Sequence, residues 1–68
     1  MRSIMKRVAR NVKRLRKARG MTQEALAAQV DIHRVYLAQL EGATRAPSLA
    51  LLDRLAKALK VRVEEVVK

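Results

Sequence analysis

Apolar residues recur at three- and four-residue steps along most of the chain, with polar residues between them. This is the period of an amphipathic helix, whereas a half-buried strand alternates apolar and polar positions. The pattern predicts helices over about residues 4–19, 22–30, 33–41, 49–59 and 63–67. Residues 61–63 also fit a strand, because β-branched residues favour strands. Glu64 and Glu65 favour a helix start at the same place.

Four of the five predicted helices have one apolar stripe each that would face a common core. The stripes consist of Ile4, Val8, Val12, Leu15 and Ala18; of Leu26, Ala27 and Val30; of Leu37 and Leu40; and of Leu49, Leu52, Leu55, Ala56 and Leu59. Val35, Tyr36 and Gln39 fall away from the stripe of their helix, and so does Leu51 in the following one. We therefore expect an all-α, compact five-helix fold with these four side chains off the core-facing stripes.

The predicted helix ends have suitable residues. Gly20 fits the left-handed residue that often ends a helix, and the hydroxyls of Thr22 and Ser48 can cap the helices that follow them. The second and third helices are short and are joined by a turn of three to four residues around Asp31. That spacing is typical of a helix-turn-helix unit, here at about residues 22–41 of a single domain spanning residues 1–68.

The positive net charge of the chain limits the kinds of molecule that can be its binding partner. The chain has 16 Lys and Arg against 6 Asp and Glu, for a net charge of +10. Nine of the basic residues precede Gly20, and no acidic residue occurs before Glu24. Such a concentrated positive field implies an anionic partner, which is nucleic acid, an anionic membrane or an acidic protein. No apolar run approaches the roughly 20 residues of a membrane span. The first six residues lack the apolar centre of a signal peptide, so we expect a cytoplasmic protein.

The residues needed for catalysis are scarce. The chain has one histidine, His33, no cysteine and no glycine-rich phosphate loop. Glu64 and Glu65 are adjacent, so on a helix they point in different directions. A single histidine does not make a metal site. We predict no enzymatic activity, no metal, no cofactor and no small-molecule ligand.

An ordered set of motifs spanning about residues 8–67 resembles the Cro/repressor-like (XRE-type) helix-turn-helix family. The matching segments are Leu15-Arg16, Met21-Thr22-Gln23-Glu24-Ala25-Leu26-Ala27, Val30-Asp31-Ile32, Leu37-Ala38-Gln39-Leu40-Glu41, Pro47-Ser48-Leu49, Leu52 and Leu55-Ala56-Lys57-Ala58-Leu59. The resemblance implies a lambda-repressor-like DNA-binding domain in which the helix at 33–41 enters the major groove.

The resemblance also implies roles for individual residues. It assigns DNA base contacts to Arg34, Val35, Tyr36 and Gln39, DNA backbone contacts to Gln23, Thr22, His33, Thr44 and Arg45, and a structural salt bridge to Arg16 and Glu41. The chemistry agrees, because Arg can bond bidentately to guanine and Gln to adenine, and Val35 and Tyr36 can meet a thymine methyl. Tyr36 can instead give its hydroxyl to a phosphate. Alternatively, Val35 and Tyr36 are partly buried against the first helix, and His33 only starts its helix.

The sequence departs from the family pattern at several helix ends. Asp31 occupies a turn position usually held by Gly, and Asp tolerates positive φ better than most residues. After Glu41 the family commonly has one residue and then Gly, whereas here the order is Gly42-Ala43. Lys60 stands where Gly often ends the fourth helix, and Arg62 replaces a usual Ser or Thr cap.

We expect a sequence-specific regulator of transcription, of the repressor or restriction-modification controller type, that binds double-stranded DNA. One helix-turn-helix contacts only half a site, which favours a symmetric homodimer on an inverted-repeat operator. The predicted dimer interface is Leu51, Val63, Val66 and Val67. Leu51 lies off the apolar stripe of its helix, at a position that the family usually fills with a polar residue, and the three valines give more apolar surface than one short helix needs for its own packing. Alternatively, the three valines close the core. An antitoxin-type module that neutralises a partner toxin is a second candidate function, and a membrane-active cationic helix at 4–19 is a third.

Overall fold

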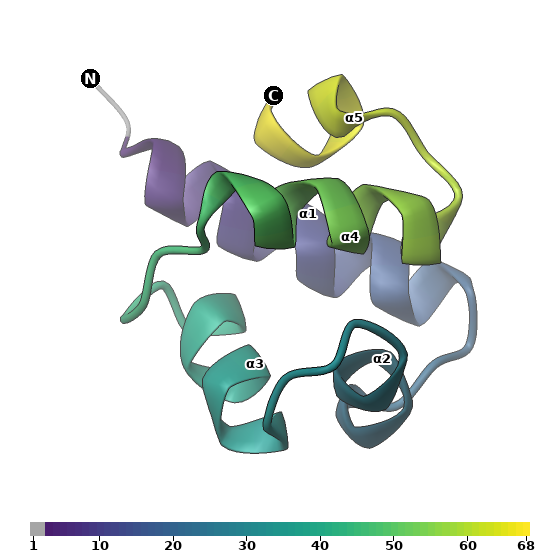
Figure 1. Ribbon diagram of the computed structural model, residues 1–68. Coiled ribbons are helices and arrows are strands. Elements are labelled where there is room, and N and C mark those ends of the chain that lie inside the picture. The colour runs from purple at the N-terminus through teal and green to yellow at the C-terminus, as the bar shows by residue number, and fades with distance from the viewer. Residues whose placement is uncertain (1–2) are drawn as a thin grey trace.

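The structure is a computed structural model that describes residues 3–68. In this part of the chain it contains five α-helices and no strand: α1 (Ile4–Ala18), α2 (Gln23–Gln29), α3 (Arg34–Glu41), α4 (Leu49–Leu59) and α5 (Val63–Val67). Figure 1 shows α4 in front of α1 and running in the same direction, with α2 and α3 on one side of this pair and α5 on the other. The prediction of an all-α fold is confirmed, and the strand alternative at 61–63 is wrong.

The helix starts follow from their capping residues. The hydroxyl oxygens of Thr22 and Ser48 each accept a hydrogen bond from the backbone N–H three residues later, at 3.1 and 3.0 Å. These two predicted caps are confirmed. His33 is also a cap, since its Nδ1 accepts the N–H of Val35 at 3.0 Å. Arg62 precedes α5 without a side-chain cap.

Left-handed residues follow four of the helices. Gly20 has φ 68°, as predicted, and Asp31, Ala43 and Lys60 have φ values of 61°, 61° and 58°. Each of these three non-glycine residues carries strain, because an L-residue in this region costs roughly 1–2 kcal/mol. Gly42 has φ −87°, a conformation open to any residue. The order Gly42-Ala43 therefore places the glycine one position before the site that needs it.

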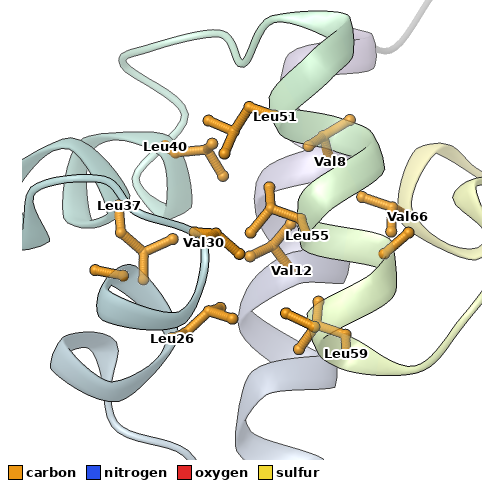
Figure 2. Close-up of a cluster of buried hydrophobic side chains, with 13 residues drawn as sticks. Val8, Val12, Leu26, Val30, Leu37, Leu40, Leu51, Leu55, Leu59 and Val66 are labelled. Atoms are coloured by element: carbon orange, nitrogen blue, oxygen red, sulfur yellow. The ribbon is translucent and has the colours of Figure 1, made fainter.

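The core is aliphatic and draws on all five helices (Figure 2). Its largest fully buried side chains are Leu26, Leu37, Leu40, Leu51, Leu55, Leu59, Val12, Val30 and Val66. This corrects the predicted stripe of α4, because Leu51 is 1% exposed and Leu49 is 86% exposed. Figure 2 shows Leu51 beside Leu40 and Val8, so it closes the core between α4, α3 and α1.

The burial of Leu51 and Val66 also corrects the predicted dimer interface. Both side chains are almost entirely covered within one copy of the chain, so neither can present surface to a partner. For Val66 the alternative of closing the core is right. Val63 is 37% exposed and Val67 is half-buried. These two remain the accessible part of the predicted interface.

A buried side-chain amide connects the first helix to the last helix. Asn11 of α1 is 2% exposed, and its Nδ2 donates to the backbone oxygen of Val66 at 2.9 Å. That carbonyl lies in the last turn of α5, where carbonyl groups lack a partner within the helix. The bond therefore satisfies two buried polar groups at once and fixes α5 on α1. The hydrophobic pattern gave no sign of this polar residue in the core.

Candidate nucleic-acid interface

The pair formed by α2 and α3 presents one side of α3 to solvent. The two helices pack against each other, and Leu37 and Leu40 bind α3 to the core. Arg34, Val35 and Gln39 are exposed. Val35 is 46% exposed, so it is accessible to a partner. An apolar side chain between two side chains able to bond base edges is suited to contact with the major groove.

Tyr36 is placed differently from its neighbours on α3. Its ring is half-buried and packs against the core, and its hydroxyl donates to the backbone oxygen of Ala46 at 3.4 Å. The guanidinium carbon of Arg45 lies 4.2 Å from the ring centroid, over the ring. Arg45 Nη1 is also 3.5 Å from Gln39 Oε1. The loop after α3 thus holds Arg45 beside the exposed side of α3, where it can meet a phosphate.

A buried ion pair supports the base of this surface. Arg16 Nε donates to Glu41 Oε2 at 2.7 Å and Arg16 Nη2 donates to Glu41 Oε1 at 3.0 Å, a bidentate arrangement. The two side chains are only 9% and 3% exposed. The hydrogen bonds to Glu41 raise the pKa of the Arg16 guanidinium, against the opposing effect of burial. The structure thus joins the two residues that the resemblance paired.

The ion pair also fixes a residue assigned to the DNA backbone. Gln23 Nε2 donates to Glu41 Oε1 at 3.1 Å, so the carboxylate anchors the amide at the start of α2. Arg16 Nη1 donates to the backbone oxygen of Met21 at 2.8 Å and holds the segment before α2. One buried carboxylate therefore connects the ends of α1 and α3 to the first turn of α2.

The remaining predicted contact residues are exposed. Thr22 and His33 stand at the starts of α2 and α3, and Thr44 follows α3, where its hydroxyl donates to the backbone oxygen of Gln39 at 3.1 Å. Sequence reasoning missed Glu24, whose Oε2 lies 3.7 Å from Arg34 Nε in a solvent-exposed pair. It also missed the packing of Arg45 on Tyr36. Residues nine apart share no helical face, so no periodicity indicates that contact.

Among residues 3–68, no three His, Cys, Asp or Glu side chains are grouped to hold a metal ion. Within the same range, no helix combines the length and apolar character needed to cross a membrane.

Comparison with known proteins agrees with this geometry. The model of a helix-turn-helix family matches residues 12–66. The immunity repressor of Bacillus phage phi105 is 38% identical over 60 residues, which cover 88% of this chain and 42% of the repressor. The control protein C.BamHI of Bacillus amyloliquefaciens is 38% identical over 48 residues, covering 71% of this chain and 59% of that protein. The chain thus spans about half the length of these curated relatives.

A solved structure extends the likeness to three dimensions. The restriction-modification controller C.Esp1396I, crystallised as a tetramer with its natural 35-base-pair operator, superposes with a TM-score of 0.81 at 26% identity, and all of both chains is covered. The family match covers most of the sequence, and the solved controller has the same fold. The chain therefore belongs to the Cro/repressor-like helix-turn-helix family.

Proposed function

We propose that this chain is a sequence-specific regulator of transcription that binds double-stranded DNA through the major groove and carries out no catalytic step. The observation that carries the proposal is the exposed side of α3, where Arg34, Val35 and Gln39 project from a rigidly held helix. The relatives named as an immunity repressor and a control protein support it, as does the operator complex of the solved controller.

Each side chain has a distinct part in this proposal. Arg34 bonds a guanine and Gln39 an adenine, while Val35 contacts a thymine methyl. Gln23 and Arg45 flank α3 and bond phosphates, which position the helix without carrying sequence information. Glu24 competes only weakly with DNA for Arg34, because ion pairs between exposed side chains contribute little free energy. DNA can therefore displace it.

We further propose a symmetric homodimer on an inverted-repeat operator. A two-fold dimer places two recognition helices about one DNA turn, or ~34 Å, apart. After the correction for Leu51 and Val66, the accessible apolar residues of α5 are Val63 and Val67. The variant Val63→Glu tests the interface, and sedimentation velocity measures whether this variant still forms a dimer. A Val63→Glu protein that sediments and binds DNA like the unchanged protein would exclude α5 from the interface.

The test of DNA recognition begins with selection of bound duplexes from a random pool, followed by footprinting on the selected site. Arg34→Ala is expected to weaken binding to that site by roughly 1–3 kcal/mol and to relax the preference at one base pair. Gln23→Ala should weaken binding to all duplexes alike. Arg54→Ala is the matched control, since Arg54 is an exposed arginine of α4 and is not among the predicted contact residues. Selection that yields no preferred site would refute the proposal.

A further inference from the structure

The outer side of α1 carries an unusual density of positive charge. Lys6, Arg10, Lys13, Arg14 and Lys17 are all exposed, and no acidic residue lies on α1. At 3.6 residues per turn these five positions share the side opposite Val12, which is fully buried. We call them the α1 basic face. None of the ion pairs within residues 3–68 includes one of them.

The α1 basic face is separate from the proposed surface of α3. Helices α1 and α3 pack together through their buried sides, which carry Val12 on α1 and Leu37 on α3. Val35 and Gln39 lie opposite Leu37 on α3, and the α1 basic face lies opposite Val12 on α1. The core stands between the two surfaces, so they point in different directions. A straight duplex on α3 therefore leaves the α1 basic face uncovered.

The larger share of charge lies on α1 rather than on α3. The proposed contact surface has two full cations, Arg34 and Arg45, and Glu24 approaches the first to 3.7 Å. The α1 basic face has five, with no acidic residue in its helix. Binding of one duplex at α3 thus leaves the five cations of the α1 basic face without a phosphate partner.

The chemistry of the α1 basic face favours a phosphate backbone over other anionic partners. A helix that lies in a membrane interface buries an apolar side in the lipid, but the apolar side of α1 is in the core. Protein partners are held by buried aromatic and apolar anchors, and lysine is depleted in such interfaces. The α1 basic face has no such anchor, whereas a nucleic-acid backbone needs only cations.

The length of the α1 basic face also matches the spacing of phosphates along DNA. From Lys6 to Lys17 the helix rises about 16 Å, and one DNA strand presents about five phosphates over that length at 3.4 Å each. We propose that the α1 basic face binds the backbone of a second segment of double-stranded DNA, without sequence preference, while the α3 surface holds the first. This inference rests on the proposed function.

The test uses two neutralised proteins with equal loss of charge. The first replaces Arg10, Lys13, Arg14 and Lys17 by Gln, and the control replaces Arg54, Lys57, Lys60 and Arg62 by Gln. Each protein is bound to an immobilised duplex carrying the selected site, washed, and offered a fluorescent duplex of unrelated sequence. The unchanged protein and the control should retain the second duplex, and the α1 variant should retain at least about tenfold less.

The salt dependence gives an independent measurement. For the second duplex, the slope of log affinity against log salt should fall by about 3–4 in the α1 variant, at about 0.9 per lost phosphate contact. Helix content by circular dichroism verifies folding. If the fourfold variant does not fold, the pair Arg10→Gln and Lys13→Gln is measured instead, with an expected change in slope of about 2.

The possible outcomes separate the two proposals. Equal retention of the second duplex by the α1 variant and the unchanged protein overturns the inference and leaves the proposed function intact. Displacement of the second duplex by polyglutamate or anionic vesicles as effectively as by duplex, at equal charge, overturns the assignment to nucleic acid. If the unchanged protein has no preferred site for the first duplex, the proposed function fails.

Discussion

Replacing Glu41 by Ala removes the acceptor at the centre of a buried network. Arg16 is 8% exposed in the unchanged protein, and without Glu41 its guanidinium keeps a single hydrogen bond, from Nη1 to the Met21 oxygen at 2.8 Å. An unpaired buried charge of this kind costs roughly 3–5 kcal/mol. A chain of 68 residues has a total stability of about 3–10 kcal/mol, at 0.05–0.15 kcal/mol per residue. Glu41→Ala should therefore consume much of the folding free energy.

Thermal unfolding followed by circular dichroism measures the loss. At about 4–8 °C per kcal/mol for a domain of this size, the Tm of Glu41→Ala should fall by roughly 12–40 °C. Glu64→Ala is the control, because Glu64 is exposed in the first turn of α5. A charge at a helix end contributes only about 0.3–1 kcal/mol. Equal Tm values for the two variants would refute the reasoning.

A double variant separates charge from packing. Arg16→Met with Glu41→Leu leaves no buried charge, so it should regain most of the stability that Glu41→Ala loses. If the double variant is as unstable as the single one, the loss comes from packing. Because Glu41 raises the pKa of Arg16, the favourable effect on Arg16 is present at every pH below the arginine pKa of the unfolded chain. The stability gap should thus stay constant from neutral to mildly alkaline pH.

Three further changes test the fold. Ala43→Gly should stabilise the chain by about 0.5–1 kcal/mol in urea unfolding, because relief of the left-handed strain exceeds the entropy cost of glycine. Ala46 does not have a positive φ, so the control variant Ala46→Gly should destabilise the chain. Asn11→Ala should cost about 1–3 kcal/mol and speed amide exchange in α5, since it leaves a buried carbonyl unpaired; exchange as slow as before would contradict this. Leu51→Ala should lower the free energy of unfolding by about 2–5 kcal/mol, and Leu49→Ala should lower it by under about 0.5 kcal/mol. Losses of similar size in the two variants would contradict the burial of Leu51.

The sequence was sufficient to predict the helices but not the orientation of every helix. Caps and periodicity act locally, so Thr22, Ser48 and Gly20 marked boundaries that the structure confirms. The α4 stripe was misplaced because leucines at 49, 51, 52, 55 and 59 cover more than one side of a helix. Only packing against α1 and α3 decides between Leu49 and Leu51, and that information is non-local.

The candidate site shows the same division. The positions of Arg34, Val35 and Gln39 off the core-facing stripe of α3 could be predicted from helical spacing, and the structure has all three exposed. The support beneath them could not be predicted from spacing, because Gln23 and Glu41 meet only when α2 packs on α3. The resemblance to a family supplied the pairing of Arg16 with Glu41, which no local pattern indicates.

The stacking of Arg45 on Tyr36 has a spectroscopic consequence. Tyr36 is the single aromatic residue of the chain, and there is no Trp or Phe. The aliphatic core therefore neither absorbs in the near ultraviolet nor fluoresces there. All intrinsic emission comes from one ring beside the exposed side of α3, with a guanidinium 4.2 Å from its centroid. A ligand that draws Arg45 away changes the surroundings of that ring, so the unlabelled protein carries its own optical reporter at this surface.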